Sequence, residues 1–139
     1  MKSGWLLILS LFLISLDQLL GLFLRHFSPH IIYKNQGIVF GWGENLPLWV
    51  LTIASLIGLA FFLWLLMKEK EWLGRLGLVG VIAGGLSNLV SRVVFGFVTD
   101  FIKISFWPAF NLADILIVVG VLLYGYSLFR HFQRKSPAA

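Results

Sequence analysis

Two aspartates in the second half of the chain could together hydrolyse an amide bond. Asp100 lies between apolar neighbours, and thirteen residues separate it from Asp114. Two carboxyl groups in contact do not ionise together easily, so such a pair shares one proton. The ionised member can take a proton from water while the protonated member polarises a scissile carbonyl. The pattern therefore predicts a pair that cleaves peptides and needs no metal.

Each carboxylate also has a structural interpretation. Asn111 stands three residues before Asp114, so both fall on one helix face, where Asn111 could cap the helix. Asp100 could be a turn residue in a loop. Asp17, inside the first apolar stretch, could make a polar contact between helices or serve function, because charges at membrane depth are costly. These alternatives stay open at this point.

The third apolar stretch combines small residues with a polar end. Gly80 and Gly84 form a small-xxx-small pair, which predicts close helix packing. Asn88, Ser91 and Arg92 follow at spacings that place them on one face. The Arg92 guanidinium could bind a carboxylate or a lipid phosphate, or it could extend to the membrane interface.

Several other functions are disfavoured by the residues present. The chain has no cysteine, which excludes disulfides, thiolate metal sites and a cysteine nucleophile. His26, His30 and His131 show no metal-ligand spacing, and no serine–histidine motif is present. We therefore expect no metal and no cofactor. The formal charge of +5 comes from residues that flank apolar runs, so we expect no nucleic-acid partner.

The elements that must position these residues are membrane helices. The chain is 59% hydrophobic and 12% charged, whereas a soluble domain is about one quarter charged. Crossing the hydrocarbon core takes about 20 helical residues. Four stretches reach that length: 5–25, 47–67, 73–93 and 110–130. We predict an all-α membrane protein with four transmembrane helices in one domain, residues 1–139, and a retained rather than cleaved first helix.

Two connecting segments are predicted to be extended. Residues 31–42 are rich in β-formers with glycine breaks, which predicts a small, curved, β-rich cradle at the interface, with Trp42 and Trp49 as anchors. Residues 97–106 also look extended. Pro108 is expected to open the fourth helix, where its missing amide proton costs little.

The basic residues predict the orientation in the membrane. Seven lie on the side that holds both ends of the chain, and four lie on the other side. The first group is Lys2, Lys68, Lys70, Arg75, Arg130, Arg134 and Lys135; the second is Arg25, Lys34, Arg92 and Lys103. The positive-inside rule then puts both termini in the cytoplasm, and Asp100 and Asp114 on the extracytoplasmic side.

These residues carry a family resemblance. The chain resembles lipoprotein signal peptidase, the bacterial type II signal peptidase, through five stretches in the family's order. They are Asp17-Gln18, Asn35-Gln-Gly-Ile-Val-Phe40, Ser87-Asn88 through Arg92, Gly96-Phe-Val-Thr-Asp100-Phe101 and Phe110-Asn111-Leu-Ala113-Asp114-Ile115. The last two stretches are the most specific.

The resemblance implies an intramembrane aspartic endopeptidase of the bacterial plasma membrane. It would remove the signal peptide from diacylglyceryl-modified prolipoproteins, just before the lipidated cysteine, and act as a monomer among membrane lipids. The catalytic aspartates map onto Asp100 and Asp114. The supporting and substrate-binding residues map onto Asp17, Asn35, Gly37, Asn88, Arg92, Asn111 and Ala113. The loop of residues 31–46 would cover the substrate.

The chain departs from the family pattern at two positions. The family usually has a lysine where this chain has Gly21, and an aspartate directly before the arginine where this chain has Ser91. One positive and one negative group are missing together. We therefore expect Arg92 to have a different partner, Asp17.

Two rival functions fit the composition. A non-catalytic membrane protein could bind lipidated peptides or lipids without cutting them, and it would tolerate asparagine at positions 100 and 114. A small transporter or proton-relay subunit would depend most on Asp17. The chain lacks the internal repeat and broken helices that transporters often show.

Overall fold

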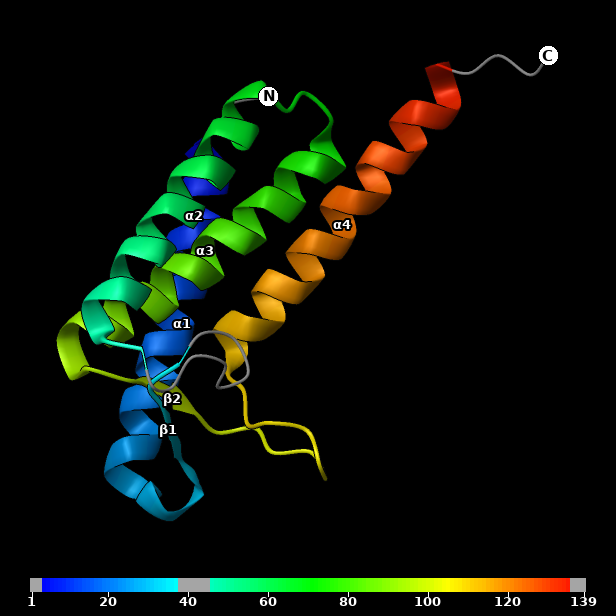
Figure 1. Cartoon of the computed structure of the whole chain (residues 1–139). Helices are drawn as coiled ribbons and strands as arrows, with labels where there is room; N and C mark the ends of the chain where they lie inside the picture. The colour runs from blue at the N-terminus through cyan, green and yellow to red at the C-terminus, as the bar shows by residue number, and fades with distance from the viewer. Residues whose placement is uncertain (1–3, 38–45, 136–139) are drawn as a thin grey trace.

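The computed structural model describes residues 4–37 and 46–135, and this part of the chain contains four long helices (Figure 1). They are α1 (Gly4–Phe27), α2 (Leu48–Lys68), α3 (Trp72–Phe95) and α4 (Leu112–Lys135). All four are long and apolar enough to cross a membrane. The four predicted spans are confirmed, although α4 begins and ends later in the chain than predicted.

Helix α3 forms the centre of the bundle. In its most apolar window 56% of the residues are buried, against 22% or less in the other three helices. It packs on α4 backbone to backbone: a Cβ atom on Gly84 would stand 2.3 Å from the Ala113 carbonyl oxygen, and one on Gly77 would stand 2.6 Å from that of Gly120. The close packing predicted from Gly80 and Gly84 is confirmed, and it fixes the α4 N-terminus against α3.

A short antiparallel sheet joins two distant loops. After a 3-10 turn (Pro29–Ile31), strand β1 (Tyr33–Asn35) pairs with β2 (Val98–Asp100), with Tyr33 opposite Asp100. The sheet predicted over 31–42 is thus confirmed for three residues, and its partner strand lies within the predicted extended segment 97–106. Trp42 and residues 38–45 lie outside the described residues. Trp49 is exposed in the first turn of α2.

The predicted start of the fourth helix is wrong. Pro108 lies in a hairpin, and α4 begins four residues later, at Leu112. The backbones of Ile102 and Phe110 pair across this hairpin, and Ser105 adopts a positive φ of 46° at its turn. Phe110 is therefore held in an extended bridge, and Asn111 is free to cap the helix.

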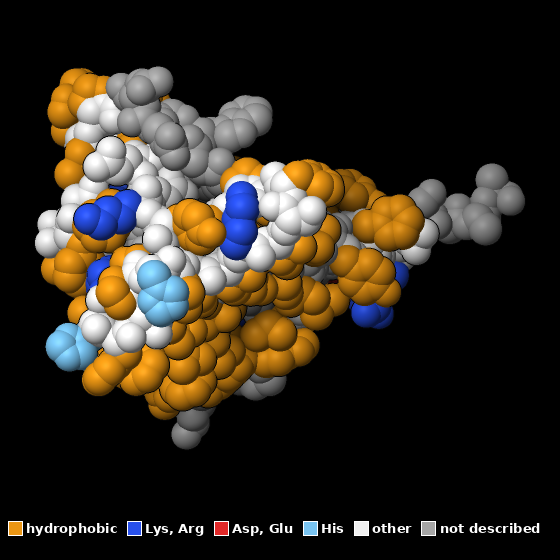
Figure 2. Space-filling view, turned by 90° about the horizontal axis from the view of Figure 1, so that it is seen from below, with side chains coloured by type: hydrophobic (Ala, Val, Ile, Leu, Met, Phe, Trp, Pro, Cys, Tyr) orange, Lys and Arg blue, Asp and Glu red, His pale blue; other side chains and the backbone are white. Residues whose placement is uncertain are grey.

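Both strands and the hairpin of residues 102–110 lie at one end of the bundle, which we call the strand end (Figure 1). The turn between α2 and α3 lies at the opposite end. There Arg134 and Glu71 form a loose, exposed ion pair with an N···O distance of 4.0 Å. Figure 2 looks onto the strand end. Hydrophobic, basic and histidine side chains lie on the described part of this face among other side chains and backbone, and no acidic side chain is visible there.

Candidate active site

Asn111 and Asp114 hold the first turn of α4 by reciprocal hydrogen bonds. The backbone N–H of Asp114 donates to Asn111 Oδ1 at 2.8 Å, and that of Asn111 donates to Asp114 Oδ2 at 3.3 Å. This is a capping box with aspartate in place of glutamate. The capping interpretation of Asn111 is therefore confirmed. The capping box uses Oδ2 of Asp114, so Oδ1 can accept a hydrogen bond from another residue.

Asp100 is buried at the end of β2, with 1% of its surface exposed. Its Oδ2 accepts a hydrogen bond from Asn35 Nδ2 at 2.9 Å, and its Oδ1 accepts one from Asn111 Nδ2 at 3.0 Å. Pairing of β1 with β2 brings Asn35 to this carboxyl from 65 positions away. The interpretation of Asp100 as a turn residue in a loop is therefore wrong, because it is a buried strand residue.

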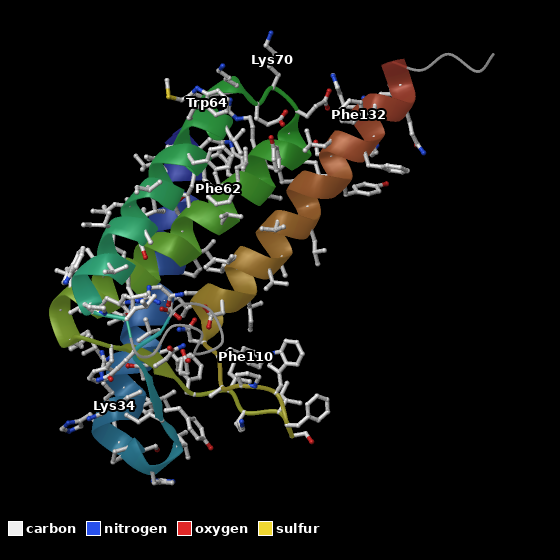
Figure 3. All side chains as sticks on the ribbon, in the orientation of Figure 1. Lys34, Phe62, Trp64, Lys70, Phe110 and Phe132 are labelled. Atoms are coloured by element: carbon white, nitrogen blue, oxygen red, sulfur yellow. The ribbon has the colours of Figure 1, made fainter. Side chains whose placement is uncertain are left out.

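Two asparagine amides connect the two carboxyl groups. Asn88 Nδ2 donates to Asp114 Oδ1 at 2.9 Å, and Asn111 Nδ2 donates to Asn88 Oδ1 at 3.0 Å. With the bond from Asn111 to Asp100, the network runs from α4 through α3 to β2. Figure 3 shows polar side chains gathered where these elements meet at the strand end. The structure therefore brings both aspartates into one buried hydrogen-bond network.

The environment of Asp100 favours its protonated form. Burial is the main cause that raises the pKa of this carboxyl from its usual value to about 7, and repulsion from Asp114 adds to the rise. The hydrogen bonds from Asn35 and Asn111 and the charge of Arg92 act in the opposite direction. A carboxyl group that is half protonated near neutral pH can serve as an acid or a base.

Arg92 is 5% exposed, interacts electrostatically with Asp114 and Asp100, and does not extend to the interface. Its guanidinium donates to the Gly37 carbonyl oxygen at 2.7 Å. Its buried Nε has no hydrogen-bond partner within the part of the chain that the structure describes. The expected pairing of Arg92 with Asp17 is wrong, because Asp17 is engaged by other groups.

Asp17 instead connects α1 to α3 and α4 by hydrogen bonds. Its Oδ1 accepts a hydrogen bond from the Ala113 backbone N–H at 3.1 Å, and its Oδ2 accepts one from Ser87 Oγ at 2.7 Å. Gln18 Nε2 donates to Ser87 Oγ and to Ser91 Oγ, each at 2.9 Å. Both Asp17 oxygens thus make contacts between helices, which favours a structural over a proton-relay role.

The two departures from the family pattern take part in this packing differently. Ser91 is buried and accepts the hydrogen bond from Gln18. Gly21 is buried too, but a Cβ atom there would meet only Thr99 Cβ, at 3.8 Å. A small hydroxyl at position 91 and a buried glycine next to Thr99 at position 21 replace the two missing charges.

Sequence reasoning missed two residues that support the site. Gln18 was visible only as a weak Asp-Gln pair, yet it bridges α1 and α3. Arg25 at the end of α1 donates to Thr99 Oγ1, beside Asp100, and its guanidinium lies 3.8 Å from the centre of the Phe95 ring. A basic residue at the end of an apolar stretch was the available signal, but the sequence explained it equally well as an interfacial charge.

Two apolar pockets reach residues of the network. One, of about 230 Å³, is lined by Trp107, Phe110, Asp114, Ile115, Val118 and Val119. The other, of about 140 Å³, runs between α2 and α3 past Phe62 and Gly85 to Asn88 and Arg92. Figure 3 places Phe62 on α2 and Phe110 just before α4. Among the described residues, no group of three or more histidine or acidic side chains is placed to hold a metal ion.

Comparison with known proteins places this chain in a defined family. The sequence profile of the family Signal peptidase (SPase) II matches residues 8–130. A lipoprotein signal peptidase of Clostridioides difficile is 40% identical over 112 residues, which are 77% of this chain and 74% of that protein. One from Moorella thermoacetica is 34% identical over 138 residues, covering 88% of this chain and 91% of that protein.

A solved structure described as a bacterial membrane enzyme shares the fold. It superposes with a TM-score of 0.84 at 22% identity, covering 98% of this chain and 94% of that one. A second such structure gives a TM-score of 0.77 at 23% identity, with 90% and 92% covered.

Proposed function

The chain belongs to the signal peptidase II family, and we propose that it removes the signal peptide from diacylglyceryl-modified prolipoproteins with Asp100 and Asp114 as its catalytic pair. Cleavage would fall just before the lipidated cysteine. Asn35, Asn88 and Asn111 would hold the two carboxyl groups. Arg92 and Gly37 would support the site, and Asp17 and Ala113 would position the first turn of α4.

The observation that carries this proposal is the single amide network that holds both carboxyl groups. Each carboxylate oxygen of Asp100 and Asp114 accepts one hydrogen bond, and three of the four come from asparagine side chains. An amide nitrogen can only donate a hydrogen bond. These bonds therefore position the carboxylate oxygens, and no asparagine nitrogen accepts the proton of the pair. The pKa of about 7 at Asp100 allows the pair to retain one proton at neutral pH.

The proposed hydrolysis uses the two carboxyl groups in different protonation states. The ionised carboxylate takes a proton from a water molecule as the water oxygen attacks the scissile carbonyl carbon. The protonated carboxyl donates to the carbonyl oxygen, which gathers negative charge. Collapse of the tetrahedral intermediate breaks the C–N bond, and the leaving amine takes a proton from the pair. Each cycle consumes one water and returns the pair to a single proton.

The apolar pockets support a substrate that arrives from the lipid. A signal peptide is a hydrophobic helix, and one pocket leads from the outside of α4 to Asp114. Lateral entry would leave the diacylglyceryl chains in the bilayer while the peptide bond reaches the carboxyl groups. The distribution of basic residues supports a site on the extracytoplasmic side and cytoplasmic termini. A single copy would suffice, because both aspartates come from one chain.

The test is a mobility-shift assay with purified protein in lipid. The substrates are a diacylglyceryl prolipoprotein and its unmodified precursor. Processing of the lipidated form alone by wild type, and of neither form by Asp114→Asn, is the expected result. Equal processing by wild type and Asp114→Asn would exclude the aspartic mechanism. Binding of the lipidated substrate without any cleavage by wild type would establish the non-catalytic alternative.

A further inference from the structure

The hairpin of residues 102–110 is an ordered projection from the strand end. Ile102 N–H donates to the Phe110 carbonyl at 2.9 Å, and Phe110 N–H donates to the Ile102 carbonyl at 3.0 Å. Nearer the tip, Trp107 N–H donates to the Ile104 carbonyl at 2.9 Å, and Lys103 Nζ donates to the Trp107 carbonyl at 2.7 Å. The tip is therefore held in a defined shape relative to its base.

The tip of this hairpin is apolar and exposed. Phe106 has 90% of its surface exposed, Ile104 has 59% and Trp107 has 46%. These residues belong to no membrane-spanning helix. Exposed apolar side chains grouped in this way mark an interaction surface, because leaving them in water is unfavourable.

The surface continues into the side of α4 that faces the lipid. Trp107 and Phe110 line one pocket together with Ile115, Val118 and Val119 of α4. Val118 and Val119 are themselves more than 40% exposed, as expected of residues that contact acyl chains. The apolar tip is thus continuous with a surface whose solvent is the bilayer.

We propose that the tip, residues 104–107, inserts into the membrane leaflet at the strand end and sets the depth of the catalytic pair. Tryptophan is typical of the membrane interface, and phenylalanine is common on the apolar face of interfacial segments. Lys103, exposed directly before the tip, can approach lipid phosphates. Figure 2 shows basic and apolar side chains together on this face, which suits anionic headgroups.

The base of the hairpin transmits the position of the tip. Ile102 lies two residues after Asp100, and Phe110 directly precedes the cap residue Asn111. Their paired backbones connect the strand that carries Asp100 to the helix that carries Asp114. The insertion depth of the tip therefore fixes the depth of both carboxyl groups. This consequence for cleavage rests on the proposed function, whereas the insertion itself does not.

The absence of cysteine allows a direct measurement of depth. Phe106→Cys would be labelled with an environment-sensitive fluorophore in vesicles of phosphatidylglycerol and phosphatidylcholine. Val119→Cys is the lipid-facing control, and Lys34→Cys, exposed on β1, is the aqueous control. We expect spin-labelled lipid, and not iodide, to quench the label at position 106, as at position 119. Quenching by iodide as at position 34 would overturn the proposal, and so would protection from both quenchers, which indicates a protein partner.

A second variant tests the consequence for cleavage. Phe106→Asp should expel the tip from the leaflet, and it should lose processing in vesicles while keeping processing in detergent micelles. Equal rates in both media would overturn the link between tip and carboxyl depth. A wild-type protein that cuts no prolipoprotein would instead contradict the proposed function and leave the quenching result standing.

Discussion

The carboxylate of Asp17 accepts a hydrogen bond from the backbone N–H of Ala113, 96 positions later in the chain. The N–H groups of the first turn of a helix have no partner within that helix, so a carboxylate from a neighbouring helix is a favourable one. Asp17 thereby positions the residue next to Asp114. The contact joins α1 to the first turn of α4, where a shift of the backbone would move the Asp114 carboxyl group.

Replacing Asp17 should therefore lower stability and activity without abolishing cleavage. Asp17→Ala removes the acceptor of the Ala113 N–H and the acceptor of the Ser87 hydroxyl, which should cost about 1–3 kcal/mol. Asp17→Asn keeps an acceptor for Ala113 and should cost less. Thermal unfolding in detergent measures the first effect. A fully stable Asp17→Ala variant with unchanged cleavage would contradict this role.

The hydrogen bonds of Gln18 and Ser87 should be energetically coupled. Gln18 Nε2 donates to Ser87 Oγ, and Ser87 Oγ donates to Asp17 Oδ2, so either substitution disturbs the same network. In a double-mutant cycle, Gln18→Ala and Ser87→Ala should show an interaction energy of about 0.5–3 kcal/mol. The control is Ser55→Ala on α2, whose hydroxyl donates to the Leu51 carbonyl of its own helix. Additive effects of the Gln18 and Ser87 substitutions would show that the bridge is energetically unimportant.

The contact between α3 and α4 should not tolerate a methyl group at Gly84. The added Cβ would stand 2.3 Å from the Ala113 carbonyl oxygen, so α4 must move. Gly84→Ala should lose about 1–3 kcal/mol of stability through overpacking. Cleavage should fall as well, because the movement of α4 lengthens the hydrogen bond from Asn88 on α3 to Asp114. Gly58→Ala on α2, where an added Cβ has open space, is the matched control and should unfold as wild type does or at a higher temperature. Equal behaviour of the two variants would contradict the packing described here.

The pH dependence of cleavage should report the pKa of Asp100. Because burial raises that pKa to about 7, the last proton of the pair leaves near neutral pH, and kcat/KM should fall as the pH rises through about 7. The hydrogen bond from Asn35 lowers this pKa, so Asn35→Ala should move the alkaline limb to higher pH.

Histidine provides the control for this profile, since its ordinary pKa of about 6.5 lies close by. His26, His30 and His131 are all exposed, and a variant that lacks all three should keep the same alkaline limb. A limb that disappears with the histidines would assign the titration to them and not to the carboxyl pair.

The four helices were predictable because twenty apolar residues in a row have few alternatives to a membrane span. The convergence of Asp100 and Asp114 was also accessible, since a short connection returns the chain to the same end of the bundle. The start of α4 was misplaced because Pro108 suits a hairpin as well as a helix terminus. Backbone pairing of Ile102 with Phe110, which sequence alone does not reveal, decides between them.

The partners of Asp17 and Arg92 were beyond the sequence for a related reason. Two charged residues of the family pattern are absent from this chain, which suggested a direct ion pair between Asp17 and Arg92. The structure instead gives each residue backbone partners, Ala113 for Asp17 and Gly37 for Arg92. Such partners depend on the rotation and depth of each helix, and the spacing of residues along one helix contains no information about its neighbours.

The central claim is that Asp100 and Asp114 act as one catalytic unit. Single-turnover cleavage of a diacylglyceryl prolipoprotein by Asp100→Asn, Asp114→Asn and the double variant tests it, with substrate binding measured in parallel. Each single variant should bind substrate yet lose roughly 10²–10⁴-fold in rate, as expected when general acid–base catalysis is removed. The double variant should be no slower than the slower single variant. A single variant that retains the wild-type rate, or a double variant whose loss is the product of the two single losses, would contradict the claim.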